Sequence, residues 1–127
     1  MLTKGFKQLL AEANASIDSI SVAMALDMYG DDDVVFVDVR EQAEREQGFI
    51  PGSVPAPRGF LEFIADPEGP MHNPVFAPDR TLVLYCGSGG RSALAAKTLM
   101  DMGFPRVCSL VGGIAAWNEA GGDMARG

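Results

Sequence analysis

The residues with the clearest chemical potential are one cysteine and the glycine-rich loop that follows it. Cys86 comes directly after the apolar run Thr81–Tyr85, and the next positions are Gly87, Ser88, Gly89, Gly90 and Arg91. Glycine allows backbone conformations in which successive N–H groups point at one anion, and a helix start adds partial positive charge. A thiol at the base of such a loop has a lowered pKa and exists partly or wholly as a thiolate. We therefore predict that Cys86 is the catalytic residue and that residues 87–91 form an anion-binding loop.

The elements around this loop predict where it lies in the fold. Thr81–Tyr85 has the continuous hydrophobicity of a strand buried on both faces, and the sequence from Ser92 onward has the two faces of a helix. Ser92 is predicted to cap that helix. The run Val34–Val37 predicts a second central strand, which ends just before Asp38 and Arg40. Because carboxyl ends of parallel strands meet at one edge of a sheet, we expect these two charged residues near the cysteine.

Three charged side chains receive supporting roles from this placement. Asp38 is predicted to be a structural carboxylate behind the loop, because an already ionised cysteine needs no general base. Arg40 and Arg58 are predicted to lie near the substrate, where they would join Arg91 in a positive spot on an acidic chain.

The remaining elements alternate between helices and strands. This alternation predicts a parallel sheet with helices on both faces, and the expected helix over 59–65 would bury Phe60, Phe63 and Ile64. The segment 66–79, which contains four prolines and the only histidine, is expected to be a substrate-shaping element or an insertion. The other predicted elements are helices over 5–15, 22–29, 41–47 and 113–120, and strands over 19–21, 53–56 and 107–111.

Composition narrows the classes of function. The chain has 127 residues and a formal net charge of −7, and its ten Lys and Arg residues are dispersed, which argues against nucleic acid or an anionic membrane as partner. Neither a signal peptide nor a membrane span is evident, so we expect a cytoplasmic protein. Two cysteines and one histidine are too few for a typical structural zinc site. Cys108 is expected to be core packing and His72 an exposed loop residue.

Four motifs in this order resemble the single-domain rhodaneses, a family of sulfurtransferases. They are V-D-V-R-E at 37–41, G-F-I-P-G-S at 48–53, C-G-S-G-G-R-S at 86–92 and L-V-G-G-I-A-A-W at 110–117. The resemblance implies a rhodanese-like fold, a five-stranded parallel sheet with helices on both faces, in one domain over 19–122. Residues 1–18 would form a helical extension and 123–127 a tail. It also implies that Cys86 carries sulfane sulfur as a persulfide, from a small-molecule or protein persulfide donor to a thiol acceptor, without metal or organic cofactor.

Two departures and two alternatives qualify this reading. Phe49 replaces a histidine that many relatives have before I-P-G, and Gly87 replaces a basic residue that thiosulfate-using relatives often have, which weakens the case for thiosulfate as donor. Phosphatases and arsenate reductases of the same fold have five residues between cysteine and arginine, whereas this chain has only Gly87 to Gly90. A non-enzymatic regulatory module is the other alternative, although inactive copies usually lose the cysteine.

Overall fold

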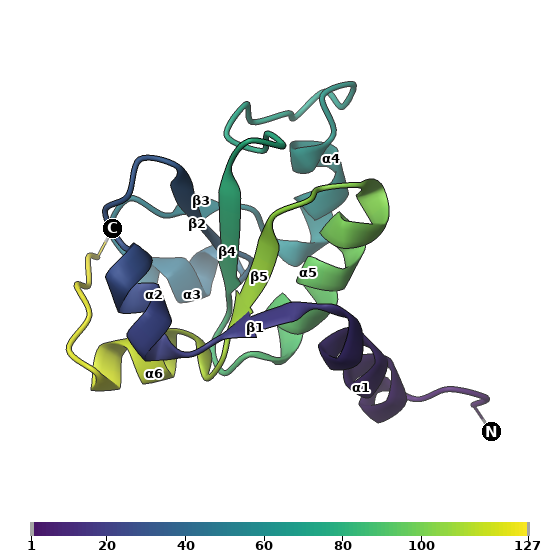
Figure 1. Cartoon of the computed structure of the whole chain (residues 1–127), viewed down its shortest axis with the longest axis horizontal. Coiled ribbons are helices and arrows are strands. Elements are labelled where there is room, and N and C mark those ends of the chain that lie inside the picture. The colour runs from purple at the N-terminus through teal and green to yellow at the C-terminus, as the bar shows by residue number, and fades with distance from the viewer. Residues whose placement is uncertain (1, 127) are drawn as a thin grey trace.

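Five parallel strands form a single sheet in the order β1-β5-β4-β2-β3. The structure is a computed structural model that describes residues 2–126, and Figure 1 shows it with the carboxyl ends of β4 and β5 at the bottom. The predicted five-stranded parallel sheet with helices on both faces is confirmed. The strands are β1 Asp18–Ile20, β2 Val34–Asp38, β3 Val54–Pro55, β4 Thr81–Tyr85 and β5 Val107–Leu110.

The two central strands bring the predicted site residues to one edge. β2 and β4 pair in register from Val34 opposite Thr81 to Asp38 opposite Tyr85, and both strands are almost wholly buried, as continuous apolar runs require. Because the two strands end level with each other, the residues that follow them leave the sheet side by side. Cys86 therefore emerges next to the turn that contains Arg40.

Helices cover both faces of the sheet (Figure 1). Each face of the sheet has its own hydrophobic core. One face packs against α1, α4 and α5, and the other packs against α2 and α6, where Trp117 contacts Phe36 and Tyr29. Within residues 2–126, every helix is too short or too polar to cross a bilayer. The helical elements are α1 Phe6–Ser16, α2 Val22–Met28, α3 Gln42–Gln47, the 3-10 helix η1 Arg58–Phe60, α4 Leu61–Ala65, α5 Gly90–Met102 and α6 Gly113–Glu119.

The helix predicted over 59–65 differs from expectation in its buried face. It begins as the 3-10 turn η1, and Phe60 and Phe63 are 52% and 53% exposed, so the prediction that they are buried is wrong. The predicted burial of Ile64 is confirmed, and Leu61 and Ala65 are buried with it, because the i, i+3, i+4 spacing directs these three toward the core. Phe60 lines a groove of about 560 Å³ along β3, together with Phe49 and Met71 among others.

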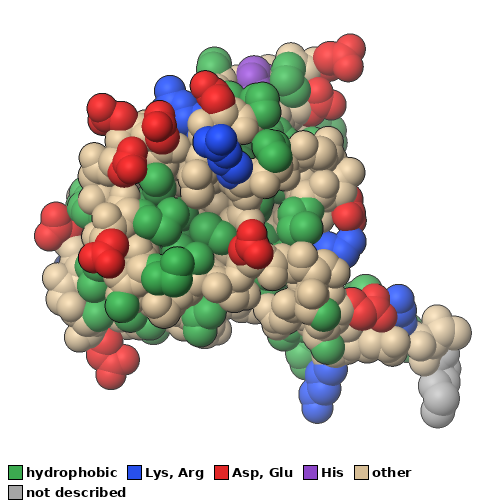
Figure 2. Space-filling view, viewed as in Figure 1, with side chains coloured by type: hydrophobic (Ala, Val, Ile, Leu, Met, Phe, Trp, Pro, Cys, Tyr) green, Lys and Arg blue, Asp and Glu red, His purple; other side chains and the backbone are tan. Residues whose placement is uncertain are grey.

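The irregular segment 66–79 lies at the opposite end of the sheet from Cys86. It leads into the start of β4, at the top of Figure 1, whereas the cysteine follows the end of that strand. The only histidine, purple in Figure 2, lies at this same end, and Nδ1 of His72 is 3.2 Å from the carbonyl oxygen of Ile64. His72 therefore does not reach the predicted active-site loop.

Candidate active site

The sulfur of Cys86 lies inside a tight loop between β4 and α5. Tyr85 ends the strand and Gly90 begins the helix, so residues 86–89 make the whole connection. The backbone N–H of Gly89 donates to Sγ at 3.1 Å and that of Ser92 donates at 3.4 Å. The cysteine is only 1% exposed, which places its sulfur at the floor of the loop.

These donors favour the ionised form of the sulfur. Burial by itself raises the pKa of the Cys86 thiol, but the hydrogen bonds from Ser92, Gly89 and Ser88 outweigh burial and lower that pKa below its ordinary value. The predicted lowering of the thiol pKa by backbone amides therefore has a geometric basis in this loop.

The first turn of α6 holds two carbonyl groups of the loop. The N–H groups of Ile114 and Ala115 donate to the carbonyl oxygens of Cys86 and Gly87, at 2.9 and 3.3 Å. These carbonyls belong to the peptide units that carry the N–H groups of Gly87 and Ser88, so α6 fixes the direction of the Ser88 N–H, one of the donors that lower the Cys86 pKa. Gly113 allows the close approach, since a Cβ atom there would lie 2.5 Å from the Cys86 carbonyl oxygen and its φ is +59°. The sequence predicted only the start of a helix at this position.

The predicted loop glycines have different structural roles. Gly89 has a φ of +116°, which residues with a side chain rarely adopt, and it is the N-cap of α5. Gly87 has no such constraint, and a Cβ atom there would lie 3.3 Å from the guanidinium nitrogen Nη2 of Arg91. A side chain at Gly87 is therefore compatible with the backbone, whereas one at Gly89 is strained.

Arg91 is paired with an acidic side chain from α3. Its Nη1 and Nη2 donate to the two carboxylate oxygens of Glu44 at 2.6 and 2.9 Å. The hydrogen bonds from Arg91 lower the pKa of Glu44 to about 2. The Glu44 carboxylate, with a smaller contribution from the nearby Cys86 sulfur, raises the pKa of Arg91. The Arg91 and Glu44 side chains are 43% and 38% exposed, so an anion can compete with the carboxylate from solvent.

Asp38 lies at the centre of a buried ionic cluster beside the loop. Its carboxylate accepts hydrogen bonds from Arg40, from Arg45 and from the hydroxyl of Tyr85, with distances of 2.9 to 3.2 Å. The Arg45 guanidinium also stacks on the ring of Phe49, at 4.1 Å from the ring centroid. The Asp38 carboxylate is thus hydrogen-bonded to neighbouring side chains, which is compatible with the structural role predicted for it.

Arg40 and Arg58, the two arginines predicted to lie near the substrate, both have their guanidinium groups paired within the protein. Arg40 is 7% exposed, and its guanidinium is taken up by Asp38 and by the carbonyl oxygen of Gly48 at 2.7 Å. Arg58 pairs with Glu62 at 3.0 Å and contacts the Thr98 hydroxyl at 3.2 Å, well along α5 from the loop. The partners of a long side chain depend on which residues lie near it in the folded structure, and the sequence does not give this information. Neither guanidinium is left facing the sulfur.

Ser92 does not cap α5 as predicted. The helix begins at Gly90, so Ser92 lies within its first turn and its hydroxyl points back into the loop. There its Oγ lies 3.6 Å from the Cys86 sulfur, donates to the carbonyl oxygen of Gly89 at 3.1 Å and lies 2.8 Å from the Oγ of Ser109. Ser88, by contrast, is an exposed residue on the outside of the loop.

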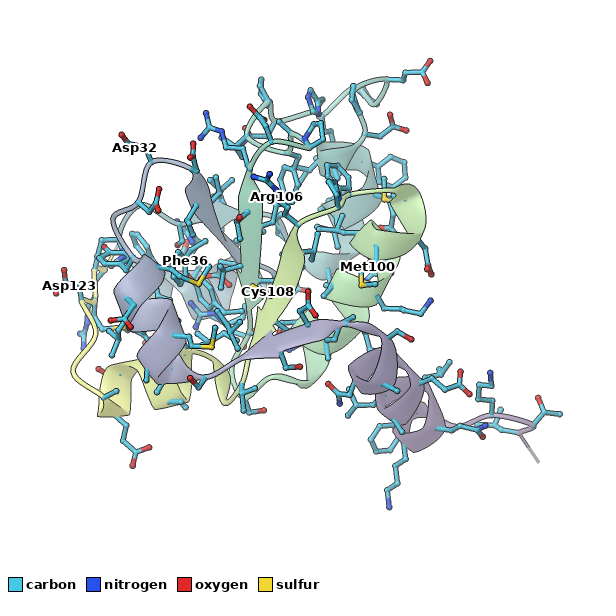
Figure 3. The ribbon with its side chains drawn as sticks, in the orientation of Figure 1. Asp32, Phe36, Met100, Arg106, Cys108 and Asp123 are labelled. Atoms are coloured by element: carbon cyan, nitrogen blue, oxygen red, sulfur yellow. The ribbon has the colours of Figure 1, made fainter. Side chains whose placement is uncertain are left out.

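Cys108 is separated from Cys86 by the sheet itself. It pairs with Val83 in the register of β4 and β5 and belongs to the core between the sheet and α2 and α6, within the sheet in Figure 3. Cys86 belongs to the core on the other face. Burial raises the pKa of the Cys108 thiol to about 11. This location fits the expected packing role and keeps the two sulfur atoms apart.

Comparison with known proteins identifies the family. The rhodanese-like domain family matches residues 21–120. A sulfurtransferase from Allochromatium vinosum is 38% identical over 105 residues, 83% of this chain and 89% of that protein, and the thiosulfate sulfurtransferase GlpE of Pseudoalteromonas translucida is 31% identical over 102 residues, 80% and 89%. A solved structure from Rhodopseudomonas palustris, a protein of unknown function described as a possible tyrosine phosphatase, has a TM-score of 0.94 and 46% identity, covering 98% of this chain and 97% of that one. With the motifs, the fold and these matches in agreement, this chain belongs to the rhodanese-like domain family.

Proposed function

We propose that this chain is a sulfurtransferase that carries sulfane sulfur on Cys86. The observation that carries the proposal is the convergence of two backbone N–H groups, from Gly89 and Ser92, on a sulfur whose pKa they lower. Sulfurtransferases among the relatives support the same class of reaction. A packing cysteine would need neither the inward amides nor the cation of Arg91 beside it.

The reaction divides into two half-reactions at one atom. In the first, the Cys86 thiolate attacks the outer sulfur of the donor, a new S–S bond forms, and the donor leaves with the electron pair of its broken bond. In the second, an acceptor thiolate attacks the outer sulfur of the persulfide and the Cys86 thiolate is released. The loop amides stabilise the negative charge on sulfur before and after transfer. This sequence requires ping-pong kinetics.

The charges around the loop favour a donor of low charge. Position 87 offers no cation, Arg40 is occupied by Asp38, and Arg91 is shared with Glu44. A thiosulfate dianion would have to displace the Glu44 carboxylate to obtain a full counter-charge. We therefore propose a persulfide, of a small molecule or a protein, as the preferred donor and a thiol as the acceptor.

Intact mass spectrometry of the protein after incubation with a persulfide donor tests this function. Wild type and Cys108→Ser should each gain one sulfur atom that a reductant removes, whereas Cys86→Ser should gain none and show no turnover. Serine is nearly isosteric with cysteine, so circular dichroism should show an intact fold. Its hydroxyl is not ionised, so it cannot replace the thiolate in the reaction. A gain of sulfur that persists in Cys86→Ser, or that disappears in Cys108→Ser, would contradict the assignment.

Phosphoester hydrolysis is the second candidate, because the relative of known structure with 46% identity is described as a possible tyrosine phosphatase. Against it, only four residues, Gly87 to Gly90, separate Cys86 from Arg91, and this short loop leaves less room for a tetrahedral phosphate than for one sulfur atom. Hydrolysis of an aryl phosphate by wild type, lost in Cys86→Ser and without persulfide formation, would favour this candidate over sulfur transfer.

A further inference from the structure

Behind the active-site loop lies a serine hydroxyl that the proposed reaction does not use. Ser109 is on β5, is 3% exposed, and its Oγ is 2.8 Å from the Oγ of Ser92. It borders a cleft of about 250 Å³ between the loop, α1 and β1, which is also lined by Asn14 and Ser19. In residues 2–126, Ser92 is the only side chain that is hydrogen-bonded to the Ser109 hydroxyl.

The hydrogen bonds around Ser92 do not balance without a donor. Its hydroxyl has one proton but two neighbouring acceptors, the carbonyl oxygen of Gly89 at 3.1 Å and the Cys86 sulfur at 3.6 Å once that sulfur is ionised. If Ser92 donated to Ser109 instead, both acceptors would lose its proton. If Ser109 donates to Ser92, the proton of Ser92 remains available to the thiolate. The hydrogen bond from Ser109 also polarises the Ser92 hydroxyl and makes it a stronger donor.

We propose that Ser109 is a positioning residue for Cys86, which donates to Ser92 so that the Ser92 hydroxyl can turn toward the thiolate. This inference rests on the proposed function of Cys86 as the nucleophile. When the sulfur carries no charge, as in the thiol or in a persulfide whose charge is on the outer sulfur, the Ser92 hydroxyl returns to the Gly89 carbonyl. The hydroxyl pair thus responds to the charge state of the inner sulfur.

The charged groups near the sulfur are the same with and without the Ser109 hydroxyl. Arg91 lies beside it on α5, and Glu44 on α3 holds that guanidinium. On the neighbouring strand end, Asp38 is paired with Arg40 and Arg45. None of these groups is hydrogen-bonded to Ser109, so a substitution there isolates the hydroxyl relay.

The test is the ionisation midpoint of Cys86, followed by the ultraviolet absorbance of the thiolate and by the pH dependence of its alkylation. Ser109→Ala should raise the midpoint by about 0.5 to 1 pH unit, the shift expected from the loss of one net hydrogen bond to the thiolate. At a pH below the midpoint, alkylation should become about three- to tenfold slower. Ser109→Thr and Ser109→Val form a matched pair of nearly equal shape, both suited to a strand. The threonine variant should keep the wild-type midpoint, and the valine variant should shift it as alanine does.

Ser19→Ala is the control, because Ser19 pairs with Ser109 in the strand register and lines the same cleft without a hydrogen bond to Ser92. It should leave the midpoint unchanged. Equal midpoints for the threonine and valine variants, or a shift in Ser19→Ala as large as in Ser109→Ala, would overturn the proposal. These measurements use no sulfur donor, so they remain decisive even if Cys86 proves not to carry sulfur.

Discussion

Two adjacent strand ends at the same edge of the sheet satisfy their polar groups in opposite ways. After β2, the buried carboxylate of Asp38 is paired with the buried Arg40 and the partly buried Arg45 through side-chain hydrogen bonds. After β4, the Cys86 sulfur is held by backbone N–H groups, with only a half-exposed Arg91 as charged neighbour. The first end is closed by ion pairs between its own side chains, whereas the second keeps backbone donors that a ligand can use. Proximity to the Cys86 sulfur is therefore not enough to make a charged side chain available to a ligand bound there.

The largest effect is expected from opening the closed end. Asp38→Ala leaves the Arg40 guanidinium buried without its carboxylate, which should lower the free energy of unfolding by about 3–5 kcal/mol in urea denaturation. The matched control is Glu62→Ala, which removes the partner of Arg58 in an exposed pair and should cost less than about 1 kcal/mol. Equal losses in the two variants would show that burial of the Asp38 cluster contributes nothing to stability.

A smaller effect on stability, but a direct one on the sulfur, is expected from the support of the β4 end. In Gly113→Ala the new methyl group would collide with the Cys86 carbonyl oxygen, which lies 2.5 Å from the Cβ position. We expect a loss of about 1–3 kcal/mol in the free energy of unfolding and a raised Cys86 pKa, measured by alkylation rate against pH.

Gly121→Ala separates collision from backbone strain. Gly121 also has a positive φ, of +82°, but a Cβ atom there meets open space. This control should lose about 1 kcal/mol from strain alone and keep the Cys86 pKa of wild type. A Cys86 pKa unchanged in both variants would mean that α6 does not orient the loop amides.

The smallest effect is expected from the pair that joins the two regions. Because Arg91 lowers the pKa of Glu44 to about 2, the pair stabilises the fold fully above about pH 4.5 and loses this contribution only as the pH falls toward 2. Glu44→Gln keeps a capping-box side chain on α3 and should change stability by less than about 1 kcal/mol. It should lower the KM for thiosulfate a few-fold by freeing Arg91.

The pH dependence of that KM sharpens the Glu44 prediction. Glu44 stays ionised above about pH 4.5. The ratio of the thiosulfate KM of wild type to that of Glu44→Gln, from steady-state kinetics, should therefore not change between about pH 5 and pH 8. A neutral persulfide donor is the control and should show no change in KM. An equal change for both donors would mean that the carboxylate does not compete with an anion.

The sequence was most informative where the signal is local. The apolar runs of β2 and β4 and the loop after Cys86 all follow from neighbouring residues. The domain boundaries over 1–18, 19–122 and 123–127 remain predictions, although β1 begins at Asp18 and α1 packs on the same face as α5.

The rest depended on contacts between distant segments. Nothing near Ser109 in the sequence indicates that it meets Ser92, and the contact of Gly113 with the loop joins positions far apart in the chain. Glu44 was missed as the partner of Arg91, although its spacing after Arg40 on a short helix could have suggested that it faces the same edge. Such pairings are set by how the elements pack, which no local pattern encodes.

The support of the loop by α6 has a consequence for the life of the chain before it is folded. Of the amides that lower the pKa of Cys86, that of Ser88 shares a peptide unit with the Gly87 carbonyl held by Ala115, so the full set acts together only after α6 has docked. A nascent or unfolded chain therefore has an ordinary, mostly protonated thiol at this position, which reacts slowly with oxidants. The reactive thiolate therefore forms only when the fold is complete. Any condition that detaches α6 from the loop should raise the Cys86 pKa toward its ordinary value without breaking a covalent bond.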